Sequence, residues 1–113
     1  MIEKIIRDFL LDYLSVPIYT EIPKSYPSMF YTIEKTGSAQ VNHIKRSTVA
    51  MKSCSKNSLY EAATMNETLK GIMLYDLLKS PAIIQVELNS DYNFTDPETG
   101  IYRYQAVFDI KHY

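Results

Sequence analysis

Residues 82–113 have the sequence AIIQVELNSDYNFTDPETGIYRYQAVFDIKHY, and this stretch decides the fold. Apolar and polar side chains alternate along both of its halves, which the turn-forming segment Thr95–Gly100 separates. Alternation with a period of two is typical of half-buried strands, and two such runs around a turn predict an antiparallel hairpin. Each arm of this hairpin would approach about 35 to 40 Å in length.

The even positions of both arms carry the apolar side chains and are expected to form the buried face. They are Ile84, Val86, Leu88, Tyr92 and Phe94 in the first arm and Tyr102, Tyr104, Ala106, Phe108 and Ile110 in the second. We expect Phe108 and Ile110 to face the helices, with Leu88 paired across from that strand. Asp109 would then be exposed.

Upstream of the hairpin, the N-terminal segment Ile2–Leu14 is predicted to be an amphipathic helix. Its apolar residues recur at helical spacing, at positions Ile2, Ile5, Ile6, Phe9, Leu10 and Tyr13. Ser15-Val16-Pro17 should end it, because a residue that precedes proline avoids helical dihedrals.

Three strands are predicted between the two helical regions, over Ile18–Ile22, Met29–Lys35 and Ile44–Cys54. Prolines flank the first of these strands, which favours an edge position in the sheet. The polar segment Thr36–Asn42 is expected to be a loop.

A second helix is predicted after Ser58, because Ser58-x-x-Glu61 has the pattern of a capping box. Ser80-Pro81 should end it. Gly71 inside this helix costs about 1 kcal/mol relative to alanine, so we expect close packing or a bend there. The expected apolar stripe consists of Leu59, Ala62, Ala63, Asn66, Leu69, Met73, Leu74 and Leu77.

The predicted element order is therefore α-β-β-β-α-β-β, an α+β fold within a single domain of residues 1–113. A single antiparallel or mixed sheet would be packed by two helices, with the long hairpin at the C-terminus. A chain of this length should bury roughly two-thirds of its unfolded surface, enough for one modest core.

Composition bears on partners and localisation. A net charge of −1 and a pI near 6.1 give no basic footprint, so we expect no specific recognition of nucleic acid. The chain lacks both the uninterrupted apolar segment of a signal peptide and the roughly 20 apolar residues of a membrane span. We therefore expect a soluble protein made in the cytoplasm, with no membrane partner.

No constellation of residues indicates catalysis, a cofactor or a metal site. His43 and His112 have no second imidazole or suitably spaced carboxylate nearby, so we expect them to be solvent-exposed or interface residues. Cys54, the single cysteine, is expected to act as a small hydrophobic residue. The acidic residues Asp91, Asp96 and Glu98 straddle a turn without the denser pattern of a calcium loop.

Tyrosine is unusually frequent, with ten residues in the chain. Tyr92, Tyr102, Tyr104 and Tyr113 cluster in the hairpin. Core packing and a protein interface both explain such a cluster, because tyrosine is enriched at interfaces as well as in cores.

The whole chain resembles the tail terminator proteins of long-tailed bacteriophages and related prophages, which are also called tail completion or tail-to-head joining proteins. Four stretches carry the resemblance: Ile2–Leu14, Pro17–Pro23, Thr48–Met51 with the Ala62-Ala63 helix, and Tyr102–Ala106. The match lies in element order and residue character, without an invariant catalytic signature.

The resemblance implies a structural, non-enzymatic virion protein without a cofactor. Such a subunit forms a homohexameric ring that caps the head-proximal end of the tail tube, ends tube growth and joins tail to head. Its partners would be further copies of itself, the tail tube protein and the head connector, with DNA free to pass through the ring. It would be assembled in the host bacterial cytoplasm and located in the virion tail.

The candidate residues for a subunit interface or the ring lumen are His43, Lys45, Arg46 and Arg103. The first three lie in or beside the expected loop, which would project towards a neighbour or the lumen. An ordinary solvated hairpin is the alternative for this segment.

Other functions stay open. Another head-tail connector, or a minor tail or capsid component, would share the same fold, because fold alone does not settle role. A small cytoplasmic enzyme would require a pocket with convergent polar groups near Cys54 or His43. A host-side interaction or nucleic-acid-binding module would require a basic aromatic sheet face, for which the available residues are Lys45, Arg46, Lys52, Lys56 and Arg103.

Overall fold

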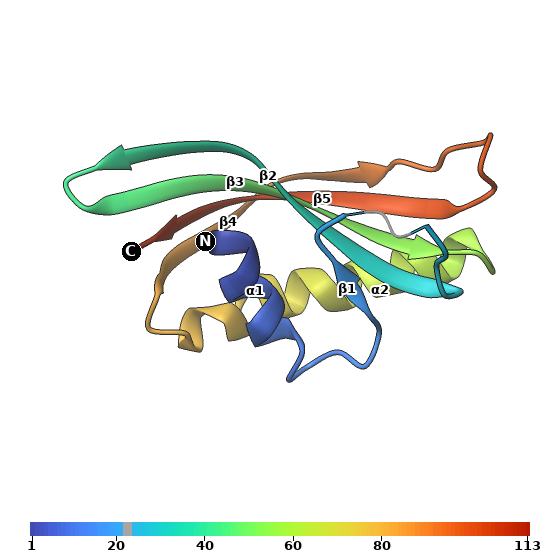
Figure 1. Cartoon of the computed structure of the whole chain (residues 1–113), viewed down its shortest axis with the longest axis horizontal. Coiled ribbons are helices and arrows are strands. Elements are labelled where there is room, and N and C mark those ends of the chain that lie inside the picture. The colour runs from blue at the N-terminus through green and yellow to red at the C-terminus, as the bar shows by residue number, and fades with distance from the viewer. Residues whose placement is uncertain (22–23) are drawn as a thin grey trace.

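The chain folds into two layers, a five-stranded mixed sheet and a layer of helices that covers one of its faces (Figure 1). The structure is a computed structural model that describes residues 1–21 and 24–113. Its strand order is β1-β2-β3-β5-β4, with β1 parallel to β2 and every other pair antiparallel. The predicted α+β class and element order are confirmed.

The helices and strands have these bounds in chain order: α1 (Ile2–Leu10), β1 (Ile18–Tyr19), β2 (Met29–Val41), β3 (Ile44–Ser55), α2 (Leu59–Leu74), the 3-10 helix η1 (Asp76–Lys79), β4 (Ile83–Asn93) and β5 (Tyr102–His112).

The first helix and the first strand both end earlier than predicted. Helix α1 ends at Leu10, where a turn takes over before Pro17 is reached. Strand β1 covers only Ile18 and Tyr19, and the prediction for Ile22 and Pro23 lies outside the described residues. The edge position predicted for this strand is confirmed.

The predicted loop over Thr36–Asn42 is wrong, because β2 continues through it to Val41. A bulge between Lys35 and Gly37 absorbs the irregular register, and β2 then pairs with β3 up to the turn. Asn42 and His43 form this turn with positive φ angles of 51° and 67°. Two successive residues with positive φ are the mark of a type I′ hairpin turn, in which asparagine is favoured. The result is a long hairpin arm.

Helix α2 begins as predicted, but only half of the expected capping box forms. The Glu61 amide donates to Ser58 Oγ at 3.0 Å, whereas the Glu61 carboxylate accepts from Ser55 Oγ and Asn57 Nδ2. Close packing at Gly71 is not found, because a methyl group added there would meet no atom within 4 Å. The buried stripe of α2 is Ala62, Met65, Asn66, Leu69, Ile72 and Met73.

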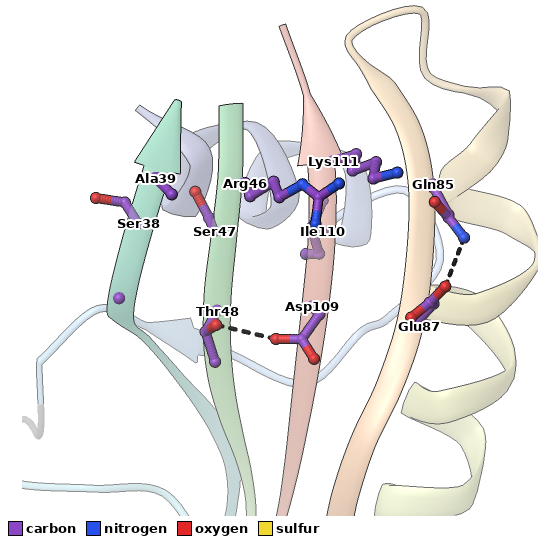
Figure 2. A pocket seen from close by; sticks show the side chains of 11 residues that line it. Ser38, Ala39, Arg46, Ser47, Thr48, Gln85, Glu87, Asp109, Ile110 and Lys111 are labelled. Atoms are coloured by element: carbon purple, nitrogen blue, oxygen red, sulfur yellow. Dashed lines mark hydrogen bonds between the residues drawn. The ribbon is translucent and has the colours of Figure 1, made fainter. Parts of the chain in front are cut away.

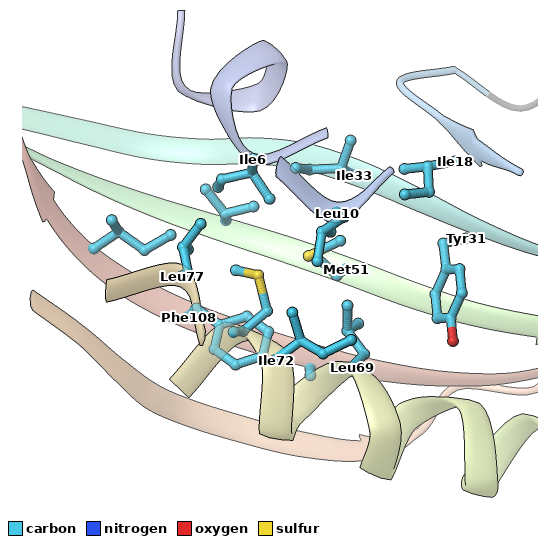
Figure 3. Packing of buried hydrophobic residues seen from close by; sticks show 14 of the residues in the cluster. Ile6, Leu10, Ile18, Tyr31, Ile33, Met51, Leu69, Ile72, Leu77 and Phe108 are labelled. Carbon is cyan, nitrogen blue, oxygen red and sulfur yellow. The ribbon is translucent and has the colours of Figure 1, made fainter. Parts of the chain in front are cut away.

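The main core lies between the helices and the sheet, where side chains from both layers interdigitate (Figure 3). Ile6 and Leu10 come from α1, whereas Leu69 and Met73 come from α2. The fully buried Tyr31 donates its hydroxyl to the Met65 carbonyl at 3.2 Å, so its polar end is satisfied. The sheet contributes Ile18, Ile33, Val49, Met51, Ala106, Phe108 and Ile110.

The C-terminal hairpin is confirmed, but its predicted buried face is continuous only from Ala106 to Ile110 in β5. Ala106, Phe108 and Ile110 are buried against the helices, and Leu88 pairs directly with Phe108, as expected. In β4 only Val86 and Leu88, which lie between the bulges at Ile83/Gln85 and Leu88/Ser90, keep the predicted face, and Leu88 is exposed because β4 is an edge strand. Each bulge inserts one residue, which moves the side chains after it to the other face of the sheet. The exposed even positions of the hairpin are Ile84, Leu88, Tyr92, Phe94 and Tyr102.

Candidate assembly surface

Within the described residues, no helix covers the sheet face opposite α1 and α2, and we call this face the open face (Figure 1). Antiparallel pairing aligns residues across β2, β3, β5 and β4 in rows, so the register determines which residues share this face. One row is Gly37, Thr48, Asp109 and Glu87, and the next is Ala39, Arg46, Lys111 and Gln85. Both rows belong to the half of the sheet that carries the β2–β3 arm.

These two rows line a shallow groove of about 480 Å³ on the open face (Figure 2). The part of the groove formed by β2 is lined by small residues, Gly37, Ser38 and Ala39. Asp109 accepts hydrogen bonds from Thr48 Oγ1 at 2.9 Å and from Asn89 Nδ2 at 3.0 Å, which fixes its carboxylate. On β4, Gln85 Nε2 donates to Glu87 Oε1 at 2.6 Å.

Arg46 and Lys111 face each other directly across β3 and β5 in this groove. Figure 2 shows the Arg46 side chain extended over β5, towards Lys111. Neither cation takes part in an ion pair among the residues that the structure describes. Arg46 and Lys111 therefore form a positive wall on one side of the groove, and like charges placed directly opposite on a sheet are destabilising.

The structure brings three of the four predicted site residues together on the β2–β3 arm. His43 lies in the turn at the tip, and Lys45 and Arg46 come next on β3. Adjacent strand residues point to opposite faces, so Arg46 lies on the open face and Lys45 on the face that carries the helices. All three side chains are exposed.

Arg103 lies far from this group, because the β4–β5 loop and the β2–β3 turn lie at opposite ends of the molecule (Figure 1). The long axis of the molecule measures 44 Å. Arg103 Nε donates to the Phe94 carbonyl at 3.2 Å, and its guanidinium lies over the Phe94 ring at 5.2 Å and 3.8 Å from an Asp96 oxygen. These contacts hold the β4–β5 loop in place.

The basic residues available for a nucleic-acid surface therefore split into two groups. Lys45 and Arg46 lie on the arm, whereas Lys52 and Arg103 both contact the Phe94 ring near the other end. Lys56 lies over the ring of Tyr26 at 5.1 Å. No continuous basic face joins the two groups within the described part of the chain, because Thr48, Ala50 and Asp109 lie between them.

His112 and Cys54 are both buried, which corrects the expectation that His112 is a solvent-exposed or interface residue. His112 Nε2 lies 2.8 Å from Ser47 Oγ, within hydrogen-bond distance, and burial lowers the pKa of its imidazole. Burial raises the pKa of the Cys54 thiol to about 11, despite the nearby Arg103 and Lys52 cations. Cys54 packs with Phe30 and Ile101 in a small second core on the open face.

Two acidic residues of the hairpin, Asp91 and Asp96, lie beside cationic side chains. Asp91 pairs with Lys70, and Asp96 lies near Arg103. Within residues 1–21 and 24–113, no group of three or more His, Cys, Asp or Glu side chains is placed to hold a metal ion. No helix among these residues is long and apolar enough to span a membrane.

No protein-family model matches this chain, and no curated protein matches it.

The sequence did not indicate that Glu87 and Lys111 line the groove on the open face, or that Val41 and Ile44 lie at the tip of the β2–β3 arm. Val41 and Ile44 pair next to the turn, and they are 62% and 37% exposed. The available signal was the dipeptide Asn42-His43, because asparagine tolerates the left-handed conformation of a tight hairpin turn. Recognising that turn would have extended the strand through residues 36–41.

Proposed function

We propose that this chain is the subunit of a ring that caps the head-proximal end of a bacteriophage tail tube. The ring ends tube growth and joins the tail to the head connector, and the subunit has no enzymatic role. The proposal rests on the resemblance of the whole chain to tail terminator proteins, together with the element order α-β-β-β-α-β-β, in which these stretches occur.

The β2–β3 arm supports a role in assembly. Its distal part extends beyond the helical layer (Figure 1), and residues 34–46 are all exposed. Val41 and Ile44 place apolar surface at its tip, where no core lies beneath them. An exposed apolar tip on a projecting hairpin is a typical contact surface for a neighbouring subunit.

The shape of the molecule also suits a layer between two other structures. Its long axis runs along the strands, and the β2–β3 turn and the β4–β5 loop lie at its two ends. A terminator ring has to contact the tail tube on one side and the head connector on the other. We assign these two contacts to the two ends, and the contacts between copies to the sides of the sheet.

Deletion of the gene from the phage or prophage that encodes it tests this function. Electron micrographs of the lysate should show overlong or unjoined tails together with heads that lack tails. Expression of the intact chain from a plasmid should restore joined particles. Joined particles with tails of ordinary length in the uncomplemented deletion would exclude the proposed role.

A further inference from the structure

Two unpaired strand edges, on opposite sides of the sheet, are aligned with each other by the residue rows that cross it. One is the distal part of β2 (Gly37–Val41), because β1 pairs only with Tyr31 and Thr32. The other is β4, at the opposite side of the sheet. The register across the sheet places Gly37 in the row of Glu87 and Ala39 in the row of Gln85. Edge strands with free backbone groups are ready sites for strand addition.

We propose that the β4 edge of one copy pairs antiparallel with the distal β2 edge of the next copy. Strands β2 and β4 run in opposite directions within the sheet, so a copy displaced sideways continues the antiparallel order. Because the residue rows align the two edges, this contact requires no shift along the strands. A heterologous contact closes into a ring when the rotation between successive copies closes without a translation along the ring axis, and it otherwise gives a helical filament. This inference rests on the proposed ring function and names its interface.

Bulges limit the contact to a short regular segment on each edge. The regular part of β4 is Gln85–Leu88, which lies between two bulges, and the regular part of distal β2 begins after the bulge at Thr36. A bulge leaves a residue unpaired and disrupts the ladder. Without a shift along the strands, Gln85 of one copy lies beside Ala39 of the next and Glu87 lies beside Gly37, and both pairs fall within these regular segments.

The β2–β3 arm and the segment from β4 through its loop have opposite charges, and Glu87 is the charged residue that lies within the two paired segments themselves. Residues 35–47, which form the arm, contain Lys35, Lys45 and Arg46 and no acidic residue. Residues 83–101, from β4 to the end of its loop, contain no basic residue and carry four acidic ones, Glu87, Asp91, Asp96 and Glu98. Complementary charges across an interface favour the correct partner and suppress wrong ones.

On the open face, Arg46 and Glu87 are the pair that this contact brings together. Arg46 lies one strand in from the β2 edge, about 10 Å from the strand of the neighbouring copy. Gly37 and Ala39 are small, so an exposed arginine side chain can swing across β2 to the neighbour's Glu87. The contact would neutralise the positive wall formed by Arg46 and Lys111.

Disulfide trapping tests the register. The double variant Ala39→Cys/Gln85→Cys places cysteines on the two edges, and directly paired antiparallel residues have Cα separations of about 4.5 to 5.5 Å, within disulfide range. Mild oxidation of the concentrated protein should give a ladder of cross-linked species on a non-reducing gel. The ladder should end in a closed form with no free thiol at either edge.

The controls separate this contact from others. Each single variant should give little dimer, and Ala39→Cys/Glu98→Cys, which joins opposite ends of the molecule, should give no ladder. Circular dichroism of each variant shows whether it has folded. Absence of a ladder from the folded edge variant, or equally fast dimers from a single variant, would overturn the proposed pairing.

The gene deletion and the disulfide experiment test the ring function and the edge contact independently of each other. Overlong tails in the gene deletion without a ladder from the edge variant would leave the function standing and exclude this interface. A closed ladder together with normal tails in the deletion would leave the interface standing and exclude the function.

Discussion

Phe108 has no exposed surface, although Leu88, its direct partner on β4, leaves 39% of its surface exposed. The difference comes from position in the sheet. Strand β5 is central and lies under α2, whereas β4 is the edge strand. A side chain therefore contributes to stability according to what covers it, even when its cross-strand partner is apolar.

Replacing Phe108 with alanine should lower the free energy of unfolding by roughly 3 to 5 kcal/mol, because it leaves a cavity in a closed core. Leu88→Ala is the matched control on the same cross-strand pair and should lower it by about 1 kcal/mol. Urea denaturation followed by circular dichroism measures both values. Equal losses in the two variants would show that the burial of this pair is misassigned.

His112 makes stability depend on pH in a defined direction. Burial lowers its pKa in the folded chain below the ordinary value of 6.5. The unfolded chain therefore binds the proton more readily, so stability is complete above about pH 6.5 and declines as pH falls below it. The slope of this contribution reaches at most about 1.4 kcal/mol per pH unit.

The variant His112→Gln keeps a polar partner for Ser47 and removes the titrating group. Its free energy of unfolding should fall less than that of the wild type between about pH 7.5 and pH 5, a range above most carboxylate titration. Denaturant unfolding at both pH values measures the difference. The same decline in both proteins would show that His112 is not the responsible group.

At the scale of single elements, helix α2 contains a glycine that its surroundings do not require. Gly71 has ordinary helical surroundings, and an added methyl group would meet no atom within 4 Å. Gly71→Ala should therefore raise the free energy of unfolding by about 0.5 to 1 kcal/mol, because alanine loses less backbone entropy in a helix.

Gly100 is the matched control, because alanine is expected to lower stability there instead of raising it. It also has open space around it, but its φ of +71° lies in the left-handed region. Gly100→Ala should lower the free energy of unfolding by about 1 to 2 kcal/mol, the cost of that conformation for a residue with a side chain. Thermal unfolding of both variants tests the contrast, and a loss of stability in Gly71→Ala would reveal a packing role that the structure does not show.

The elements were predictable from sequence wherever a local signal determined them. Ser58 capped α2 as expected, and the alternation in β5 identified its buried face correctly. The alternation in β4 was misleading because bulges at Ile83/Gln85 and Leu88/Ser90 depend on pairing with β5. The loop predicted over Thr36–Asn42 is instead largely strand, because its pairing with β3 is a tertiary effect that local propensity does not encode.

The candidate site was only partly predictable for the same reason. His43, Lys45 and Arg46 are neighbours in sequence, so their common position on one arm was evident from the chain itself. Arg103 was grouped with them by charge, yet β5 places it at the other end of the molecule. Lys111 and Glu87 join Arg46 in the groove through strand pairing alone.

At the scale of the whole molecule, the proposed ring joins these features into one assembly. The β4 edge of one copy would pair with the distal β2 edge of the next. The β2–β3 turn and the β4–β5 loop, at the two ends of the molecule, would contact the tail tube and the head connector. Arg46→Glu and Glu87→Arg should each weaken the contact between copies, and the double variant should restore it because the two charges exchange places.

The distribution of tail lengths in a gene-deletion lysate tests the central claim most directly. Micrographs should show a single narrow length class after complementation with the wild type or with Arg46→Glu/Glu87→Arg. Overlong or unjoined tails should appear without complementation and with either single variant. Tails of ordinary length joined to filled heads in the uncomplemented deletion would contradict the account.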